Sequence, residues 1–274
     1  YVRALVVHDD GREILVETEI NRAGRNKVLV NKQRLARVRD LLGVVRCTVF
    51  APTDLQLVYE GPSVRRDMLD DALVALAPRN DALRLEVDRI IRQRNVLLKQ
   101  SNGRLTADIA TTLDVWDEKF ATLGTELGEH RARLVATISP EVSRAYEELA
   151  EKETPIAMIY EPEWRRNGLA SELASHRNDD IRRGSSTVGP HRDDLHLQLG
   201  DFPAKGYASH GESWSMAISL RIGAYNLLKS EGAEPVLILD DIFAELDTIR
   251  RQQLTSVTQL AEQTFITAAV ESDL

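Results

Sequence analysis

Residues 1–60 alternate between apolar and polar positions, as β-strands with one buried face do. The alternation runs on both sides of Asp9-Asp10-Gly11, and this arrangement predicts a β-hairpin. Shorter strands are predicted around 28–30 and 45–50, and we expect both to join the sheet that contains the hairpin. The first segment is therefore predicted to be mostly β.

Residues 61–183 follow the spacing of helices instead. Apolar side chains recur every three or four positions over 109–138, which predicts a long helix that ends before Pro140. A shorter seam over 83–97 has the same spacing, so we expect the two helices to pack antiparallel across a turn near Asn102-Gly103.

The long seam has two interpretations, a coiled-coil arm for oligomerisation or an internal helical lobe. We favour the lobe because the seam is short and a partner helix is next to it in the sequence. His130 lies in this seam, and we interpret it as a hydrogen-bonded interior histidine and not as a metal ligand.

Residues 184–274 alternate between strands and helices. The apolar run Val236 to Leu239 lies between two helical stretches, as expected of a strand in a parallel sheet that is covered on both faces. The elements predicted after the helical pair are a strand at 156–160, a helix at 169–182, a strand at 195–199, a helix at 213–228, a strand at 236–239, a helix at 249–261 and a strand at 264–269. The whole pattern predicts an α/β fold with an inserted helical lobe.

Composition places the chain among ordinary globular proteins, with 43% hydrophobic and 28% charged residues. The single cysteine, Cys47, lies in an apolar stretch, and we interpret it as a small buried hydrophobic residue of a protein from a reducing compartment. Neither a membrane-spanning run nor a secretory leader is recognisable in the sequence. We therefore expect a cytoplasmic protein with no membrane partner.

Basic side chains gather between Arg22 and Arg46, where eight of them stand against one acid, Asp40. This segment carries a net charge of +7, and because the whole chain carries −8, the other residues carry −15. Such asymmetry indicates a polyanion site, although a solvated surface paired with acids elsewhere in the fold is the alternative. The side chains expected to contact DNA phosphates are Arg22, Arg25, Lys27, Lys32, Arg34, Arg37 and Arg39.

Two adjacent carboxylates, Asp240 and Asp241, follow the apolar run at the carboxyl end of the predicted strand. Ligands of open α/β sheets bind at that end, and a divalent cation would relieve the repulsion between the two carboxylates. Magnesium is the natural candidate because it prefers carboxylate and phosphate oxygens. An ordinary strand-end turn or helix cap is the alternative.

Upstream, Ser209-His210-Gly211-Glu212 immediately precedes an apolar helix, whose N-terminus would offer free amide groups and a positive dipole to an anion. A serine at this place is also a common N-cap. The anion site is favoured because the acidic strand end follows about 30 residues later.

Several segments together resemble a known family. Ser209-x-Gly211-Glu212 resembles the signature motif of ABC-type ATPases, Leu237 to Asp241 resembles a Walker B strand, and Glu245-Leu246-Asp247 resembles the D-loop. Three further segments are similar, in an actinobacterial form, to the RecF family of SMC-like ATPases: Phe50-Ala51-Pro52-x-Asp54-Leu55-x-Leu57-Val58, Arg65-Arg66-x-x-Leu69-Asp70, and Gly189-Pro190-His191-Arg192-Asp193-Asp194-Leu195.

The resemblance implies an ABC/SMC-type ATPase head. Residues 1–60 and 184–274 would form its ATPase lobe I, and residues 61–183 would form the helical lobe II. Magnesium would be held by Asp240, and Asp241 would orient the attacking water. Thr267 would replace the switch histidine of many ABC ATPases, which implies slow hydrolysis. The residues implied to contact nucleotide from the opposite protomer are Ser209, His210, Gly211, Glu212 and, at the dimer interface, Asp247.

Two features depart from the family pattern. His210 stands where the generic signature motif has glycine, which affects how closely the backbone can approach phosphate. No Gly-x-x-x-x-Gly-Lys-Ser/Thr occurs in the sequence, and we interpret the chain as a fragment that lacks the first strand, phosphate loop and helix. A weak ATPase is therefore expected of the full-length protein and no activity of this chain alone.

The function implied is ATP-dependent DNA binding in recombinational repair and replication. The family resemblance implies a homodimer that forms with ATP and Mg²⁺ on gapped or junction DNA and helps RecO and RecR to load a recombinase. The alternative is a non-hydrolysing DNA-binding or dimerisation module. A phosphatase or nuclease built on Asp240 and Asp241 would need further carboxylates, which the sequence does not supply. A metal pair formed by His191 and Asp193 is weighed against a packed turn, and the turn is favoured.

Overall fold

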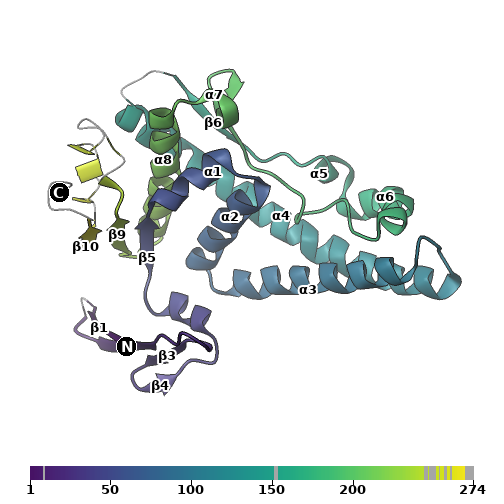
Figure 1. The fold of residues 1–274 in the computed structure, drawn as a ribbon, viewed down its shortest axis with the longest axis horizontal. Coiled ribbons are helices and arrows are strands. Elements are labelled where there is room, and N and C mark those ends of the chain that lie inside the picture. The colour runs from purple at the N-terminus through teal and green to yellow at the C-terminus, as the bar shows by residue number, and fades with distance from the viewer. Residues whose placement is uncertain are drawn as a thin grey trace.

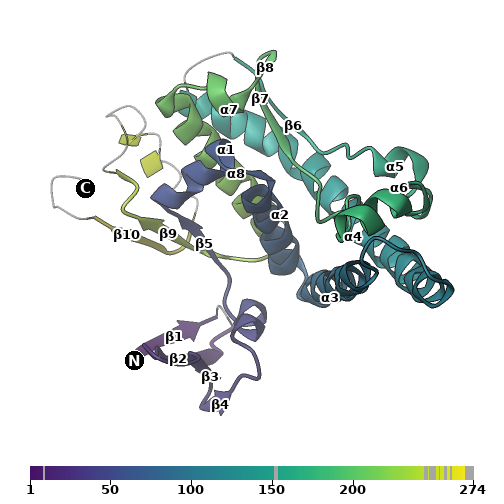
Figure 2. The same cartoon turned by 45° about the vertical axis from the view of Figure 1, so that its right-hand side comes forward.

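The computed structural model describes residues 1–8, 10–150, 154–243, 246, 251–252, 254–255, 258–259 and 261–268, with the side chains at 39, 42 and 43 left undescribed. A four-stranded sheet projects from the body at one end, and a long helical hairpin projects at the other (Figures 1 and 2). Among the described helices, none combines the length and the apolar composition that crossing a bilayer requires.

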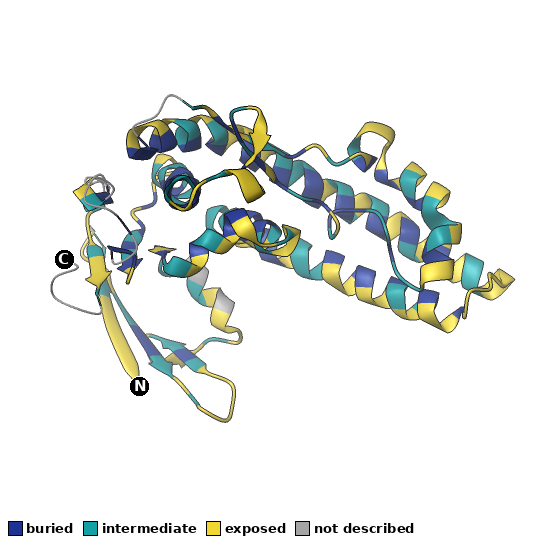
Figure 3. Ribbon diagram, turned by 45° about the horizontal axis from the view of Figure 1, so that its top comes forward, coloured by how far each residue is buried: buried dark blue, intermediate teal, exposed yellow. Residues whose placement is uncertain are grey.

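The N-terminal sheet is an antiparallel meander in the order β1-β2-β3-β4, formed by Val2–Val7, Glu13–Glu19, Lys27–Val30 and Gln33–Arg34. The predicted hairpin is confirmed, with Val2 paired to Thr18 and Val7 to Glu13. Asn31 and Lys32 both have positive φ angles, as a tight hairpin turn between β3 and β4 requires. The edge strand β1 is exposed along most of its length (Figure 3).

The strand predicted near 45–50 does not join this sheet, so that prediction is wrong. A short 3₁₀ helix, Val38–Gly43, leads the chain away, and β5 (Cys47–Phe50) pairs in parallel with β9 (Val236–Asp240). On the other side of β9 lies β10 (Thr264–Thr267), which is also parallel. The pairing places the carboxyl ends of the three strands at one edge, because Phe50 lies opposite Leu239 and Thr267 opposite Asp240.

Cys47 is exposed, contrary to the sequence-based expectation. In β5 the side chains of Thr48 and Phe50 are buried, whereas those of Cys47 and Val49 point to the other, exposed face. Among the described residues the sheet is packed on one side, where Phe50, Leu237 and Leu239 share a core with Trp214. The expectation that the 236–239 strand is covered on both faces is therefore wrong, since Val236 and Ile238 are only half-buried. The apolar run around the cysteine reflects a strand with one buried face and not a fully buried one.

The helical region contains η2 (Pro52–Leu55), α1 (Gln56–Tyr59), α2 (Pro62–Leu76), α3 (Arg79–Gln100) and α4 (Ala107–Ala150). Helices α3 and α4 lie antiparallel, as predicted, and the turn between them has positive φ angles at Asn102 and Gly103 (Figure 1). His130 is half-buried and hydrogen-bonded through Nδ1 to Asn80 Oδ1 at 3.1 Å. Burial lowers its pKa, as expected of an interior histidine.

Helix α4 does not end before Pro140, and the prediction that it does is wrong. The helix continues for ten residues to Ala150, although proline removes one backbone hydrogen bond. The continuation buries Val142, Tyr146 and Leu149. Tertiary packing along α8 (His210–Ser230) therefore outweighs the local cost of proline.

The remaining elements lie beside the helical hairpin and at the top of the view in Figure 1. They are β6 (Ile156–Ile159), α5 (Trp164–Asn167), α6 (Leu169–Arg183), β7 (His196–Leu199), β8 (Phe202–Pro203) and α7 (Ala204–Tyr207). Strands β6, β7 and β8 form a separate antiparallel sheet, so the predicted 195–199 strand is not part of the parallel sheet. Of the helix predicted over 249–261, residues 251–252, 254–255 and 258 are helical, and several others lie outside the described residues.

Candidate functional site

The carboxyl edge of the parallel sheet brings two of the predicted residues into contact. The Thr267 hydroxyl donates a hydrogen bond to Asp240 Oδ1 at 2.6 Å, from the end of β10 to the end of β9. Asp241 follows with a positive φ of 53°, a conformation that aspartate tolerates better than most residues, and its amide donates to Thr267 Oγ1 at 3.1 Å. All three residues are exposed, so the edge is open to a ligand.

The chemistry of this edge fits a magnesium ion that is shared with a ligand. Asp240 supplies a carboxylate and Thr267 a hydroxyl, both hard oxygen donors. Among the described residues no group of three or more His, Cys, Asp and Glu side chains could hold a metal by itself. Magnesium bound here would therefore need oxygen ligands from water or phosphate, which is how it is commonly held in nucleotide sites.

Ser209 is the N-cap of α8 and forms a capping box with Glu212. Ser209 Oγ accepts a hydrogen bond from the Glu212 amide at 3.3 Å, while Glu212 Oε2 accepts from the Ser209 amide at 2.9 Å and from Ser209 Oγ at 2.7 Å. The helix begins at His210, three residues earlier than predicted, so Gly211 and Glu212 lie within its first turn. Ser209 and the N-terminus of α8 are therefore exposed next to each other on the protein surface.

An ion pair that sequence reasoning missed links α8 to the parallel sheet. Arg221 donates from Nε and Nη2 to Asp54 Oδ1 at 3.0 and 2.6 Å. The other oxygen of the buried Asp54 carboxylate accepts from the Ala51 amide at 3.0 Å, in the loop that follows β5. The loop beside the Asp240 edge is therefore anchored to the helix that Ser209 caps. A separation of 167 residues gave no local signal for this pair.

Four of the predicted DNA-contacting side chains surround one hollow of about 520 Å³ in the N-terminal sheet. They are Arg25, Lys27, Arg34 and Arg37. Lys27 also pairs with Glu19 at 3.0 Å. Arg22 and Lys32 do not line the hollow, and the side chain of Arg39 lies outside the described residues. The sequence predicted that these cations lie in one segment, but it did not predict that four of them line the same hollow.

The Gly189 to Asp194 segment is a packed turn. Asp193 accepts hydrogen bonds from Tyr160 Oη at 2.5 Å and from Trp164 Nε1 at 2.7 Å, and burial raises the pKa of Asp193. The Asp194 carboxylate accepts hydrogen bonds from both Nε and Nη2 of Arg65. The His191 ring donates from Nε2 to the Ser186 carbonyl at 3.2 Å, so His191 and Asp193 serve different partners and form no metal pair.

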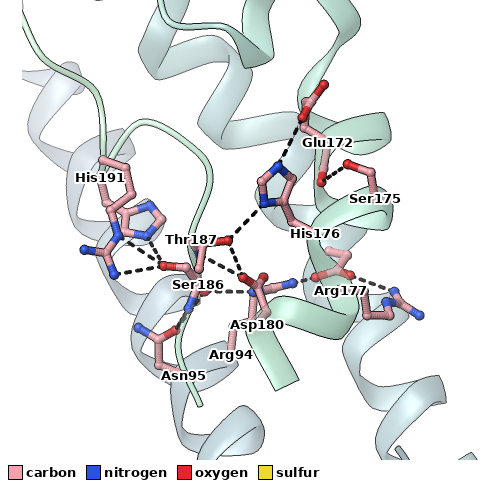
Figure 4. Close-up of polar contacts among 12 residues, drawn as sticks. Arg94, Asn95, Glu172, Ser175, His176, Arg177, Asp180, Ser186, Thr187 and His191 are labelled. Carbon is pink, nitrogen blue, oxygen red and sulfur yellow. Dashed lines mark hydrogen bonds and ion pairs between the residues drawn. The ribbon is translucent and has the colours of Figure 1, made fainter. Parts of the chain in front are cut away.

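Arg192 belongs to the same packing. Its guanidinium donates twice to the Ser186 carbonyl, at 3.0 and 3.1 Å. Ser186 in turn joins the fully buried Arg94, which also binds Asp117 and Asp180 at 2.6 Å each (Figure 4). The turn therefore fastens α6 and the following loop to the α3–α4 hairpin.

The predicted D-loop residue Asp247, together with Glu245, lies outside the described residues. Its role as an interface residue stays a prediction. The roles assigned to the other site residues likewise stay predictions.

Comparison with known proteins shows which family the chain is similar to. No protein-family model matches it. It is 45% identical over 287 residues to the DNA replication and repair protein RecF of Streptomyces avermitilis, covering all of this chain and 76% of that protein. It is 42% identical over 291 residues to the RecF protein of Cutibacterium acnes, covering 97% of this chain and 74% of the relative.

Solved structures agree with this. A structure of the recombination mediator protein RecF with ATPrS, in the RecFOR pathway, matches with a TM-score of 0.85 and 25% identity over 99% of this chain and 75% of that one. The Smc head domain of Pyrococcus furiosus matches in fold, with a TM-score of 0.50 and 14% identity over 97% of this chain and 67% of that one. The fold is thus the mixed α/β head with long helices that RecF and Smc share. The chain belongs to the RecF family of DNA replication and repair proteins.

Proposed function

We propose that this chain forms most of an ATP-switched DNA-binding head, which pairs with a second copy around ATP. The observation that carries the proposal is the Asp240–Thr267 contact at the carboxyl edge of the parallel sheet. It is supported by the capped helix at Ser209 and by the ATP and ATPrS named for the RecF structures. Magnesium, when bound, would neutralise charge on phosphate oxygens.

Each residue has a distinct proposed role. Asp240 holds magnesium, with its carboxylate oriented by the Thr267 hydroxyl, and Asp241 orients the attacking water. Ser209 and the first turn of α8, including Gly211, approach the γ-phosphate of nucleotide held by the other copy. Thr267 has no titratable ring, so proton transfer from this position is absent and hydrolysis is slow. Slow hydrolysis suits a switch better than a motor.

We infer partners from the relatives. The structure named for the RecFOR pathway supports RecO and RecR as partners. We further propose that ATP-dependent dimers form on gapped or junction DNA. The basic segment around β3 and β4 supplies the DNA contacts. A non-hydrolysing DNA-binding or dimerisation module is the second candidate, because the sequence has no Gly-x-x-x-x-Gly-Lys-Ser/Thr.

The test uses the extended protein, meaning this chain preceded by the phosphate-loop segment of a RecF relative. Ser209→Arg should leave ATP binding by single copies nearly intact and abolish ATP-driven dimerisation, because Ser209 acts on the other copy's nucleotide. Asp240→Asn should weaken magnesium-dependent ATP binding itself. Equilibrium binding below the dimerisation concentration and sedimentation above it separate the two effects. Loss of single-copy ATP affinity in Ser209→Arg would overturn the composite site.

DNA binding by the basic segment is tested by salt dependence. Log K should fall by about 0.9 per neutralised phosphate for each unit of log salt concentration on duplex DNA. Replacing Arg34, Arg37 and Arg39 with Ala should flatten this slope. An unchanged slope in the triple variant would move the DNA contacts to another surface and leave the segment as a solvated face.

A further inference from the structure

The hairpin formed by β7 and β8 stops early and leaves part of one edge of β7 without a neighbouring strand. Strand β8 pairs with only the last two residues of β7, and the chain then turns into α7 at Ala204 (Figure 2). Leu197 therefore has no strand beside it on that side, although it pairs with Met158 of β6 on the other. A strand edge of this kind is a template for a further strand.

The backbone groups of Leu197 point to the open side. The Gly200 amide donates to the carbonyl of Pro155, just before β6, at 2.7 Å, which fixes the hydrogen-bonding pattern between β6 and β7. Because opposite residues in an antiparallel pair are alternately hydrogen-bonded and non-hydrogen-bonded, Leu199 and Leu197 point away from β6. Leu199 pairs with β8, but no described residue takes the amide or the carbonyl of Leu197. The edge thus offers one free donor and one free acceptor.

A pocket of about 290 Å³ lies beside this edge. It is lined by Leu197 and its neighbours on β7, by Pro203 and Lys205, and by Val58 and Arg65 of α1 and α2. Because Pro203 has no N–H, it cannot satisfy the Leu197 carbonyl. A pocket of this size has room for about two extended residues of a peptide, and it is too small for a folded element.

The pocket carries a net positive charge. Arg65 and Asp194 neutralise each other through two hydrogen bonds, at 2.8 and 2.9 Å. Lys205 is exposed and forms no ion pair with a described residue, and its ammonium group reaches only the Glu60 carbonyl, at 3.5 Å. An acidic side chain of a ligand would therefore find a free cation here.

Two exposed aromatic side chains accompany the pocket residues. Phe202 is 55% and Tyr207 is 65% exposed, and their rings stack with centroids 5.0 Å apart and an interplanar angle of 21°. Phe202 directly precedes Pro203, and Tyr207 comes two residues after Lys205. Aromatic side chains are enriched where proteins bind one another, because a ring buries a large area. The stacked pair thus offers an anchor for an apolar side chain next to the charged group.

We propose that the free edge of β7 binds an extended segment of a partner protein, which adds as a strand beside Leu197 and places an acidic side chain on Lys205. Main-chain hydrogen bonds would supply affinity, and Lys205 with the Phe202–Tyr207 pair would supply selectivity. The site uses none of the residues proposed to contact nucleotide or DNA, so it is a separate surface for a protein partner.

The experiment measures binding of labelled peptides to this 274-residue chain by fluorescence anisotropy. The probe is acetyl-Thr-Val-Asp-Val-Thr-Val-amide carrying a fluorophore. N-methylation of alternate amides, made in both registers, should weaken binding about tenfold in one register, because it removes the donor to the Leu197 carbonyl. Hydrogen exchange of the Leu197 amide should slow when the unmodified peptide is bound. Lysine in place of the aspartate should weaken binding about fivefold.

Lys205→Glu should reverse the preference between the aspartate and lysine peptides. Lys99→Glu is the matched control, since Lys99 is an exposed lysine that does not line the pocket, and it should leave the preference unchanged. Equal melting temperatures would show that both variants fold.

Three results would overturn the proposal. Absence of saturable binding at millimolar peptide, or binding that survives N-methylation in both registers, would exclude strand addition. Self-association of the parent chain that Lys205→Glu abolishes would assign the edge to a second copy. Loss of peptide binding in the extended protein would assign it to a segment of the same protein.

Discussion

At the scale of single residues, aspartates occur both in the candidate site and in the packed interior, with different hydrogen-bond partners. Asp240 is exposed and contacts Thr267, whereas Asp193 and Asp194 are held by Tyr160 and Arg65. The sequence presents both pairs as adjacent aspartates next to a strand. Their difference comes from partners more than 25 residues away, which spacing along the chain does not reveal.

His191 gives a prediction on pH. Burial lowers its pKa to about 4 from an ordinary value of 6.5, and the nearby Arg192, Arg66 and Arg94 also disfavour the charged ring. The unfolded state therefore takes up a proton first, so stability should fall as the pH drops from about 6.5 towards 4. The loss should reach at most about 3 kcal/mol.

Denaturant unfolding between pH 7.5 and 4 measures this loss. His191→Gln is the control, because it removes the titration and keeps a side-chain donor for the Ser186 carbonyl. The variant should lose less stability than the parent across that interval. A parent and a variant with the same pH profile would show that His191 is not the group responsible.

At the scale of elements, local signals predicted the helices and strands, and packing decided where they go. The hairpin, the α3–α4 pair and the 236–239 strand follow from periodicity alone. The placement of β5 beside β9, and the passage of α4 through Pro140, do not, because both depend on contacts with segments distant in sequence. The same reason hid the Asp54–Arg221 pair.

The α4–α8 contact gives a second prediction. A Cβ at Gly223 would lie 2.4 Å from Val142 Cγ2, so the two helices approach too closely there for a larger residue. Gly223→Ala should destabilise the protein by about 1–3 kcal/mol, although alanine favours a helix. In the Val142→Ala background the clashing methyl group is absent, and the same change should cost little or stabilise. Thermal unfolding of the four proteins measures the coupling, and an equal cost in both backgrounds would contradict the close approach.

At the scale of the whole molecule, the order of segments along the chain predicted the family, and the relatives bear this out over the full length of the chain. The prediction worked because several short segments occur in the right order, each with a recognisable chemistry. The composite site was less accessible to sequence reasoning. Asp240 ends β9, and Ser209 caps the N-terminus of α8. In the proposed dimer, Asp240 of one copy and Ser209 of the other copy act on the same nucleotide.

The most direct test of that account mixes two inactive variants. In the extended protein, Ser209→Arg and Asp240→Asn should each hydrolyse ATP poorly alone. A heterodimer of the two has one site that carries both defects and one site that carries neither, so an equimolar mixture should regain part of the parent's ATP hydrolysis rate. Failure of the mixture to exceed the separate variants, under conditions in which heterodimers form, would contradict a site shared between two copies.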